Sequence, residues 1–164
     1  GTHFRVTAGT ESANFFTPLI GRFNISNALA AIASCLQLGL SLKEMPLGIS
    51  QLRQVPGRVQ RITSGHHYDV WVDFAHTDEG LRGAIAAVRP LVKGRLTVVF
   101  GAGGDRDPGK RPLMGRAAAD ADIAIVTSDN PRSENPAQIA RQIVSGWPRS
   151  IAPEADPIHV RVQR

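Results

Sequence analysis

Two short apolar runs that each end in a loop of glycines, prolines and charged side chains constrain the fold of this chain most strongly. Residues 96–100 lead into a glycine-rich loop at 101–107, and residues 123–127 lead into a second loop at 128–132. Short β-branched apolar runs are typical of strands in parallel sheets that are covered on both faces. Ligands of open α/β sheets bind beyond the carboxyl ends of the strands, so the two loops predict one wall of a site for a small anionic or zwitterionic ligand.

Helical patterns alternate with the predicted strands. Helices are expected over residues 79–89, 110–119 and 135–146, and strands over residues 58–63, 68–74, 96–100, 123–127 and from 158 onward. Asp78 is the expected N-cap of the first helix, Asn135 that of the third, and Gly146 is expected to close the third. The alternation predicts an α/β fold built from βαβ units around a parallel sheet.

The chain has a different character before Pro56. Residues 2–7 and 14–18 predict short strands or a hairpin, and a helix beginning at Asn24 is expected to bury one face. That face carries Ala28, Ala31, Ile32, Cys35 and Leu36. A core of these elements alone would be thin, so residues 1–55 are interpreted as the tail of a larger domain and residues 56–164 as a second domain.

Composition excludes several classes of protein. A hydrophobic share of 42% with 20% charged residues argues for a folded core. The 19 basic residues exceed the 14 acidic ones, but they are scattered and aromatic residues make up only 5%, so nucleic acid is not an expected partner. The longest apolar stretch, residues 28–40, is too short and too interrupted to span a membrane. A single cysteine fits a reducing cytoplasm.

The glycine-rich loop matches no nucleotide motif fully. Arg106 stands where the dinucleotide fingerprint needs its third glycine, and Arg111 stands where a P-loop needs Ser or Thr. The loop can instead present Arg106, whose planar guanidinium can grip a carboxylate. The alternative, equally favoured by spacing, is that Arg106 pairs with Asp105 and Asp107 on a solvated loop.

The loop at 129–132 has a similar pair of interpretations. Pro131 stiffens it and holds Asn130 extended. Arg132 can then grip a carboxylate while Asp129 and Asn130 contact an ammonium and a second carboxylate, a combination that suits an amino acid. The alternative is a plain turn before the next helix.

Two further groups are candidates for nucleotide contacts. Asp73 and His76 lie at the end of another predicted strand and could orient a ribose or a phosphate, although a lone histidine is more often structural. Asn24 and Asn27, three residues apart on one helix, could contact an adenine edge or simply cap the helix.

Taken as whole motifs, the sequence resembles the Mur ligases of peptidoglycan synthesis. The resemblance is carried by residues 21–31 (GRFNISNALAA), 56–58 (PGR), 72–77 (VDFAHT), 100–107 (FGAGGDRD), 110–115 (KRPLMG) and 129–132 (DNPR). The last three motifs resemble the branch of the family that adds the third residue of the peptide. In that branch DNPR implies meso-diaminopimelate as the added residue.

The resemblance implies an ATP-dependent amide ligase of three domains. The chain would contain the end of the central ATPase domain (residues 1–55) and most of a Rossmann-like C-terminal domain with a mostly parallel sheet (residues 56–164). It implies ATP and Mg²⁺ as cofactors, and UDP-MurNAc-L-Ala-D-Glu and meso-diaminopimelate as small-molecule substrates. These substrates would be joined through an acyl phosphate in the cytoplasm.

The same resemblance assigns roles to individual residues. Positions that contact the nucleotide in the family match Asn24, Asn27, Arg58 and Asp73, with His76 beside them. Positions that bind diaminopimelate match Arg106, Asp129, Asn130, Pro131 and Arg132.

The family's P-loop, magnesium ligands and carbamylated lysine are expected upstream of Gly1, and a Gly-Lys-Gly-His-Glu segment downstream of Arg164. We therefore expect no catalytic residue and no metal ligand in these 164 residues, and no ligase activity from them alone. The alternative function is a non-catalytic module of ligase-like fold that binds an amino acid or a nucleotide.

Overall fold

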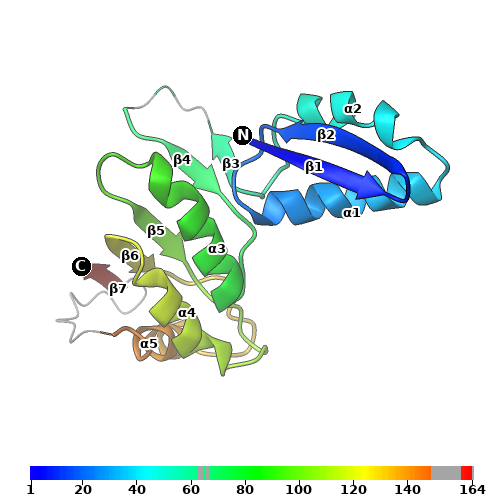
Figure 1. The fold of residues 1–164 in the computed structure, drawn as a ribbon. Coiled ribbons are helices and arrows are strands. Elements are labelled where there is room, and N and C mark those ends of the chain that lie inside the picture. The colour runs from blue at the N-terminus through cyan, green and yellow to red at the C-terminus, as the bar shows by residue number, and fades with distance from the viewer. Residues whose placement is uncertain (63–64, 66, 149–159, 164) are drawn as a thin grey trace. The chain divides into compact units, whose positions relative to one another are not determined.

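The computed structural model describes residues 1–148 except 63, 64 and 66, together with the backbone of residues 160–163. The chain forms two compact units, Gly1–Phe74 and Ala75–Arg164 (Figure 1). The expected domain division at residues 55 and 56 stays a prediction.

The first unit begins with the predicted hairpin. Strands β1 (Thr2–Ala8) and β2 (Glu11–Thr17) pair antiparallel across a turn in which Gly9 has a φ of +58°. The second strand starts three residues earlier than expected, because Glu11 already pairs with Ala8.

Three helical segments follow the hairpin: α1 (Phe23–Gln37), η1 (Leu42–Glu44) and α2 (Pro46–Gln51). Their small core contains Phe15, Ile32, Leu42 and Met45. Helix α1 buries a narrow face at i, i+4 spacing, and Ala31 lies outside it and is exposed, so its predicted core position is wrong.

The first unit ends in a short antiparallel pair, β3 (Gln60–Ile62) and β4 (Val70–Val72). Both strands are shorter than predicted. Val59 has a φ of +45°, a left-handed conformation that a β-branched residue rarely adopts, so the first strand cannot start at residue 58. The expected turn at residues 64 and 65 lies partly outside the described residues.

The second unit is an α/β arrangement around a three-stranded sheet. Strands β5 (Thr97–Phe100) and β6 (Ile123–Val126) pair in parallel, and β7 (Val160–Gln163) pairs antiparallel with β6. The predicted parallel pairing is therefore confirmed for β5 and β6, whereas β7 makes this sheet mixed. A run of four residues does not encode strand direction, which is decided by the connection that precedes it.

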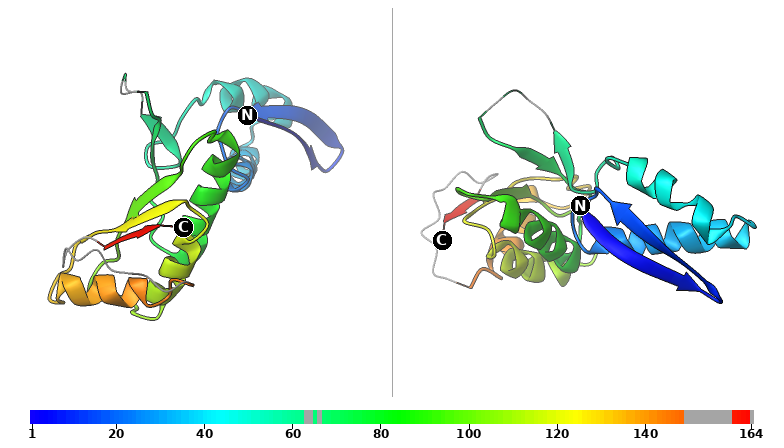
Figure 2. Two further views of the ribbon diagram at one scale, coloured as in Figure 1. Left: turned by 90° about the vertical axis from the view of Figure 1, so that its left-hand side faces the viewer. Right: turned by 45° about the horizontal axis from the view of Figure 1, so that its top comes forward.

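The helices of this unit are α3 (Asp78–Val88), η2 (Arg89–Leu91), α4 (Lys110–Ala118) and α5 (Pro136–Val144). Helices α3 and α4 lie side by side (Figure 2). Asn135 caps α5 as predicted, since its side chain accepts hydrogen bonds from Ala137 N and Gln138 N. The N-cap of α3 is Thr77 rather than Asp78, because the Thr77 hydroxyl accepts from Gly80 N.

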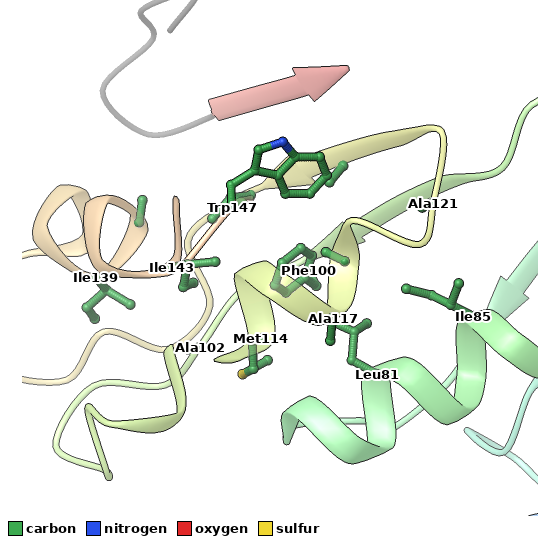
Figure 3. Packing of buried hydrophobic residues seen from close by; sticks show 14 residues of the cluster. Leu81, Ile85, Phe100, Ala102, Met114, Ala117, Ala121, Ile139, Ile143 and Trp147 are labelled. Atoms are coloured by element: carbon green, nitrogen blue, oxygen red, sulfur yellow. The ribbon is translucent and has the colours of Figure 1, made fainter. Parts of the chain in front are cut away.

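The core of the second unit lies between its sheet and helices, around Phe100, Met114, Ile143 and Trp147 (Figure 3). Helices α4 and α5 approach each other closely at two glycines. A Cβ on Gly115 would overlap the carbonyl oxygen of Ile143, and a Cβ on Gly146 would overlap that of Pro112. Helix α5 ends at Val144 with Ser145 as its C-cap, so Gly146 follows the helix end as expected. Its φ is not left-handed, and its lack of a side chain allows close contact between the helices.

Candidate functional site

The two loops singled out in the sequence leave the sheet of the second unit next to each other. Strands β5 and β6 are parallel neighbours, with Phe100 paired to Val126 at their carboxyl ends. The pairing continues one residue further, because Thr127 N donates to the Phe100 carbonyl oxygen at 2.9 Å. The loop after β5 and the loop after β6 therefore form a common rim, as parallel topology requires.

Glycines allow the loops to touch. A Cβ on Gly101 would crowd the Thr127 carbonyl oxygen, and a Cβ on Gly104 would overlap the carbonyl group of Pro131. At the same place Gly104 N donates to the Asn130 carbonyl oxygen at 2.9 Å. The glycine-rich loop is thus a surface for close backbone contact with the second loop.

Arg132 reaches across this contact. Its Nη1 donates to the Gly104 carbonyl oxygen at 2.6 Å, while its backbone N–H donates to Asn130 Oδ1 at 3.3 Å. Its φ of +49° is unusual for a residue other than glycine. Within the described part of the chain, its Nε and Nη2 make no hydrogen bond, so that edge of the guanidinium can receive a carboxylate.

The other candidates of this site are exposed or partly exposed at the same rim. Arg106 Nη1 donates to the backbone oxygen of Asp105 at 3.1 Å. None of the ion pairs among the described residues involves Arg106, so the alternative in which it pairs with the neighbouring aspartates is wrong. Asp129 Oδ1 accepts from Asn130 N at 2.7 Å, and Pro131 is half-buried against Gly104.

An ion pair between a buried arginine and a partly exposed glutamate, which the sequence reasoning missed, joins α4 to the loop after β6. Arg111, in the first turn of α4, is only 1% exposed and contacts both carboxylate oxygens of Glu134 at 2.7 Å. The same guanidinium donates to Gln142 Oε1 and to the Gly103 carbonyl oxygen. A signal was available: Arg111 lies three residues before Met114 and four before Gly115, so a helix that buries those residues also turns Arg111 inward.

The electrostatics of the rim follow from these contacts. The hydrogen bonds from Arg111, together with one from Asp105 N, lower the pKa of Glu134 to about 2. Hydrogen bonds from the side chain and backbone of Ser133 lower the pKa of Asp105. The carboxylate of Glu134 raises the pKa of Arg111, so both members of the pair are charged at neutral pH.

These shifts predict acid sensitivity. The pKa of Glu134 falls from an ordinary value of 4.5 to about 2 on folding, so the unfolded chain binds more protons between these values. The stabilisation is complete above pH 4.5 and is lost as the pH falls through about 2. We expect the melting temperature to drop over this window, and to drop less steeply in Glu134→Gln. Equal slopes for both proteins in a pH series of thermal melts would contradict the expectation.

The first unit holds a separate pocket of about 310 Å³. Mostly apolar side chains line it, together with the two asparagines of α1 and an arginine: Thr17, Leu19, Asn24, Asn27, Ala28, Ala31, Ile49, Leu52, Val55 and Arg58. Three of the predicted nucleotide-contacting residues, Asn24, Asn27 and Arg58, are therefore brought together. An apolar slot with a few polar groups is typical of small-molecule sites.

The two asparagines differ in how many of their side-chain hydrogen-bonding groups are already used within the protein. Asn24 is 1% exposed, and its Nδ2 donates to the Ile20 carbonyl oxygen at 2.7 Å. Its Oδ1 accepts from Asn27 Nδ2 at 3.0 Å, so Asn24 orients Asn27. The oxygen of the Asn27 amide accepts no hydrogen bond from the described residues. Arg58 is exposed at the pocket.

Asp73 does not line this pocket. Its Oδ2 accepts from Val59 N at 2.8 Å and so supports the strained turn that carries Arg58. His76 belongs to the second unit, where it is exposed and its backbone oxygen accepts from Lys110 Nζ at 2.8 Å. Asp73 therefore holds the turn that carries Arg58, while other side chains line the pocket.

No metal cluster is found among the described residues, since no three His, Cys, Asp or Glu side chains lie close enough to hold an ion. Within the same residues, none of the helices is both long and apolar enough to cross a membrane.

Known proteins with similar sequences point to one family. Residues 57–161 match the family described as "Mur ligase, glutamate ligase domain". The chain is 49% identical over 146 residues to the UDP-N-acetylmuramoyl-L-alanyl-D-glutamate--2,6-diaminopimelate ligase of Gloeobacter violaceus, and 51% identical over 140 residues to that of Synechococcus sp. (strain WH7803). These alignments cover 88% and 82% of the chain but only 30% and 28% of the relatives, so the chain spans less than a third of their length.

Solved structures agree with this match. A structure of a UDP-N-acetylmuramoyl-L-alanyl-D-glutamate--2,6-diaminopimelate ligase superposes with a TM-score of 0.54 at 39% identity, over 88% of this chain and 30% of that one. MurF from Acinetobacter baumannii gives a TM-score of 0.68 at 21% identity, over 88% and 31%, and supports the fold alone. With the family match extending over residues 57–161, the chain belongs to the Mur ligase family.

Proposed function

We propose that this chain is part of an ATP-dependent ligase that adds meso-diaminopimelate to UDP-MurNAc-L-Ala-D-Glu in peptidoglycan synthesis. The proposal is supported by the names of relatives at 49% and 51% identity. The observation that carries it is the rim of the second unit, where Arg132 is oriented by the Gly104 carbonyl oxygen beside Asp129, Asn130 and Arg106. We further propose that residues 1–55 end the central ATP-binding domain and that residues 56–164 belong to the C-terminal domain.

The rim suits diaminopimelate because this amino acid carries two carboxylates and two ammonium groups. In our proposal the guanidinium of Arg132 binds one carboxylate through Nε and Nη2, and Arg106 contributes a second positive charge. Asp129 supplies a carboxylate for an ammonium group, while the Asn130 amide can contact the second carboxylate. Pro131 keeps this segment rigid.

The pocket of the first unit suits the base of a nucleotide. An apolar slot can hold the ring, and the free amide oxygen of Asn27, oriented by Asn24, can accept from an exocyclic amino group. Arg58 can contact a phosphate or ribose, on a turn supported by Asp73. We include His76 as a nucleotide contact only on the resemblance. Magnesium would accompany the ATP in the whole enzyme, and we assign none of its ligands to the described residues.

The proposed reaction makes an amide bond. The D-glutamate carboxylate is first converted to an acyl phosphate at the expense of ATP. An uncharged amine of diaminopimelate then attacks the acyl carbon, and phosphate leaves as the amide forms. The residues of this chain contribute orientation, because they hold the amino acid with its amine toward the activated carbonyl. Since the reaction consumes ATP, we place the enzyme in the cytoplasm.

We expect a crossed result from two substitutions in the full-length protein. Arg132→Ala should raise KM for diaminopimelate by about 100-fold, since a bidentate charged contact is lost, while KM for ATP stays unchanged. Arg58→Ala should raise KM for ATP and leave KM for diaminopimelate unchanged. The assay is ADP release at varied diaminopimelate and ATP.

Matched controls exist in both units. Arg116→Ala removes an exposed arginine of α4, and Arg53→Ala removes an exposed arginine near the pocket, and neither should change either KM. An unchanged KM for diaminopimelate in Arg132→Ala would contradict the assignment of the rim. If wild-type full-length protein bound diaminopimelate or nucleotide without forming product, the alternative of a non-catalytic binding module would hold. The inactivity of residues 1–164 alone stays a prediction.

A further inference from the structure

We propose that Arg111 and Glu134 are positioning residues for the amino-acid site: their ion pair holds the loop after β5 against the loop after β6 and so sets where Arg132 presents its guanidinium. This inference rests on the proposed function for the identity of the amino acid. It concerns an arginine of α4 and a glutamate of the loop after β6, neither of which is proposed to contact the amino acid.

The burial of Arg111 is the first step. An arginine that is 1% exposed must have its charge compensated, because an unpaired buried charge is strongly destabilising. Its guanidinium donates to a carboxylate, a side-chain amide and a backbone carbonyl: Glu134, Gln142 and Gly103. Two of them, Gly103 and Glu134, belong to the two loops of the rim. The charge of Arg111 is therefore compensated by Glu134 of the loop after β6, and the same guanidinium also reaches the loop after β5 through the Gly103 carbonyl oxygen at 3.4 Å.

Glu134 extends the connection to the strained backbone of the first loop. Its Oε1 accepts from Asp105 N at 2.6 Å as well as from Arg111. Asp105 has a φ of +51°, which is unfavourable for a residue other than glycine. The carboxylate of Asp105 in turn accepts from Ser133 Oγ at 2.7 Å and from Ser133 N at 3.2 Å. The two loops are thus fastened by reciprocal contacts.

The same contacts fix Arg132. It precedes Ser133 and has a left-handed φ of +49°. Its guanidinium is oriented by the Gly104 carbonyl oxygen, which lies between Gly103, held by Arg111, and Asp105, held by Glu134. Loss of the ion pair would release both neighbours of Gly104. The guanidinium of Arg132 would then lose its fixed position even though Arg132 itself is unchanged.

The second unit offers a matched control pair at the other end of the sheet. Arg89 donates to both oxygens of Asp122 at 2.6 and 2.9 Å, and Asp122 also accepts from Leu96 N at 2.8 Å. This is the same combination of a bidentate arginine and a backbone N–H that Glu134 has. Leu96 and Asp122 precede β5 and β6, so this pair lies at the amino ends of the strands, away from the rim.

The test compares Glu134→Gln with Asp122→Asn in the full-length protein. We expect both variants to lower the melting temperature. Only Glu134→Gln should raise KM for diaminopimelate, by about 10- to 100-fold, because misplacement of a binding group weakens its contact with substrate. KM for ATP should not change in either variant. Glu134→Asp is not expected to rescue KM, because its side chain is one methylene shorter and its carboxylate cannot reach both Arg111 and Asp105 N.

A milder variant guards against a loss of folding. Ser133→Ala removes the hydroxyl that donates to Asp105 and leaves no buried charge. It should raise KM for diaminopimelate by about 3- to 10-fold, the equivalent of one hydrogen bond, with a smaller drop in melting temperature than Glu134→Gln. Hydrogen exchange of the Gly104 amide, which donates to Asn130, should accelerate in Glu134→Gln by on the order of tenfold relative to Asp122→Asn.

The outcomes separate this inference from the proposed function. If Glu134→Gln and Asp122→Asn change KM for the amino acid equally, the pair is a general stabilising contact and the inference is wrong. If the wild-type protein ligates a different amino acid, the proposed function is wrong and the same KM comparison is made with that amino acid. If it ligates none, exchange of the Gly104 amide decides, and equal rates in the two variants would overturn the inference.

Discussion

Gly115→Ala is expected to lower the free energy of unfolding of the second unit by about 3 kcal/mol or more, the upper range for overpacking a tight contact. The added Cβ would overlap the carbonyl oxygen of Ile143 in α5. This carbonyl lies in the last turn of α5, and rotating it away would break the hydrogen bond that it accepts from Gly146 N at 3.2 Å. Helices α4 and α5 must therefore separate, and the core around Met114 and Ile143 loses contacts on both sides.

Gly94→Ala is the matched control, because a Cβ at that position meets nothing within 4 Å and its backbone is not left-handed. Thermal unfolding of the full-length protein and hydrogen exchange in α4 and α5 would measure the effect. A melting temperature for Gly115→Ala equal to that of Gly94→Ala would mean that the two helices tolerate separation, and would refute the expectation.

The helix contact also shows what the sequence could not predict. The positions of α4 and α5 followed from their proline and asparagine signals, and the parallel pairing of β5 and β6 followed from their apolar runs. Gly146 follows the end of α5 as expected, but its contact with Pro112, a residue 34 positions earlier, was not predictable from the sequence. Contacts between distant segments leave no local pattern.

The candidate site divides in the same way. The positions of the candidate residues at the rim and in the pocket were predictable, because strand ends and exposed charged motifs have a local signature. Arg106, Asp129, Asn130 and Arg132 lie at one rim, and Asn24, Asn27 and Arg58 line one pocket. Residues that hold those side chains were missed or misjudged. In the sequence Arg111 stands out only as a failed P-loop position and as part of the KRPLMG motif, and Glu134 does not stand out at all, because their pairing depends on burial of Arg111 that only the tertiary structure reveals.

Gly104→Ala is expected to have the largest effect on the proposed amino-acid site. A Cβ there would overlap the backbone carbonyl of Pro131. Because the overlap is with backbone and not with a side chain, no side-chain movement can relieve it. The two loops would have to move apart. Gly104 N would then lose Asn130, and Arg132 would lose the carbonyl oxygen that orients it.

We therefore expect kcat/KM for diaminopimelate to fall by about 100-fold or more in full-length Gly104→Ala, since a misplacement of about 1 Å is enough for such a loss. KM for ATP should remain unchanged. Gly109→Ala is the control in the same loop, because its Cβ would meet only the side chain of Asp107, which can shift. If Gly104→Ala kept wild-type kcat/KM, contact between the two loops would not be needed to orient Arg132. If kcat/KM for diaminopimelate fell, KM for ATP rose and the melting temperature also dropped, the loop contact would stabilise the unit as well as orient Arg132. The exchange rate of the Gly104 amide would then report how far the two loops have separated.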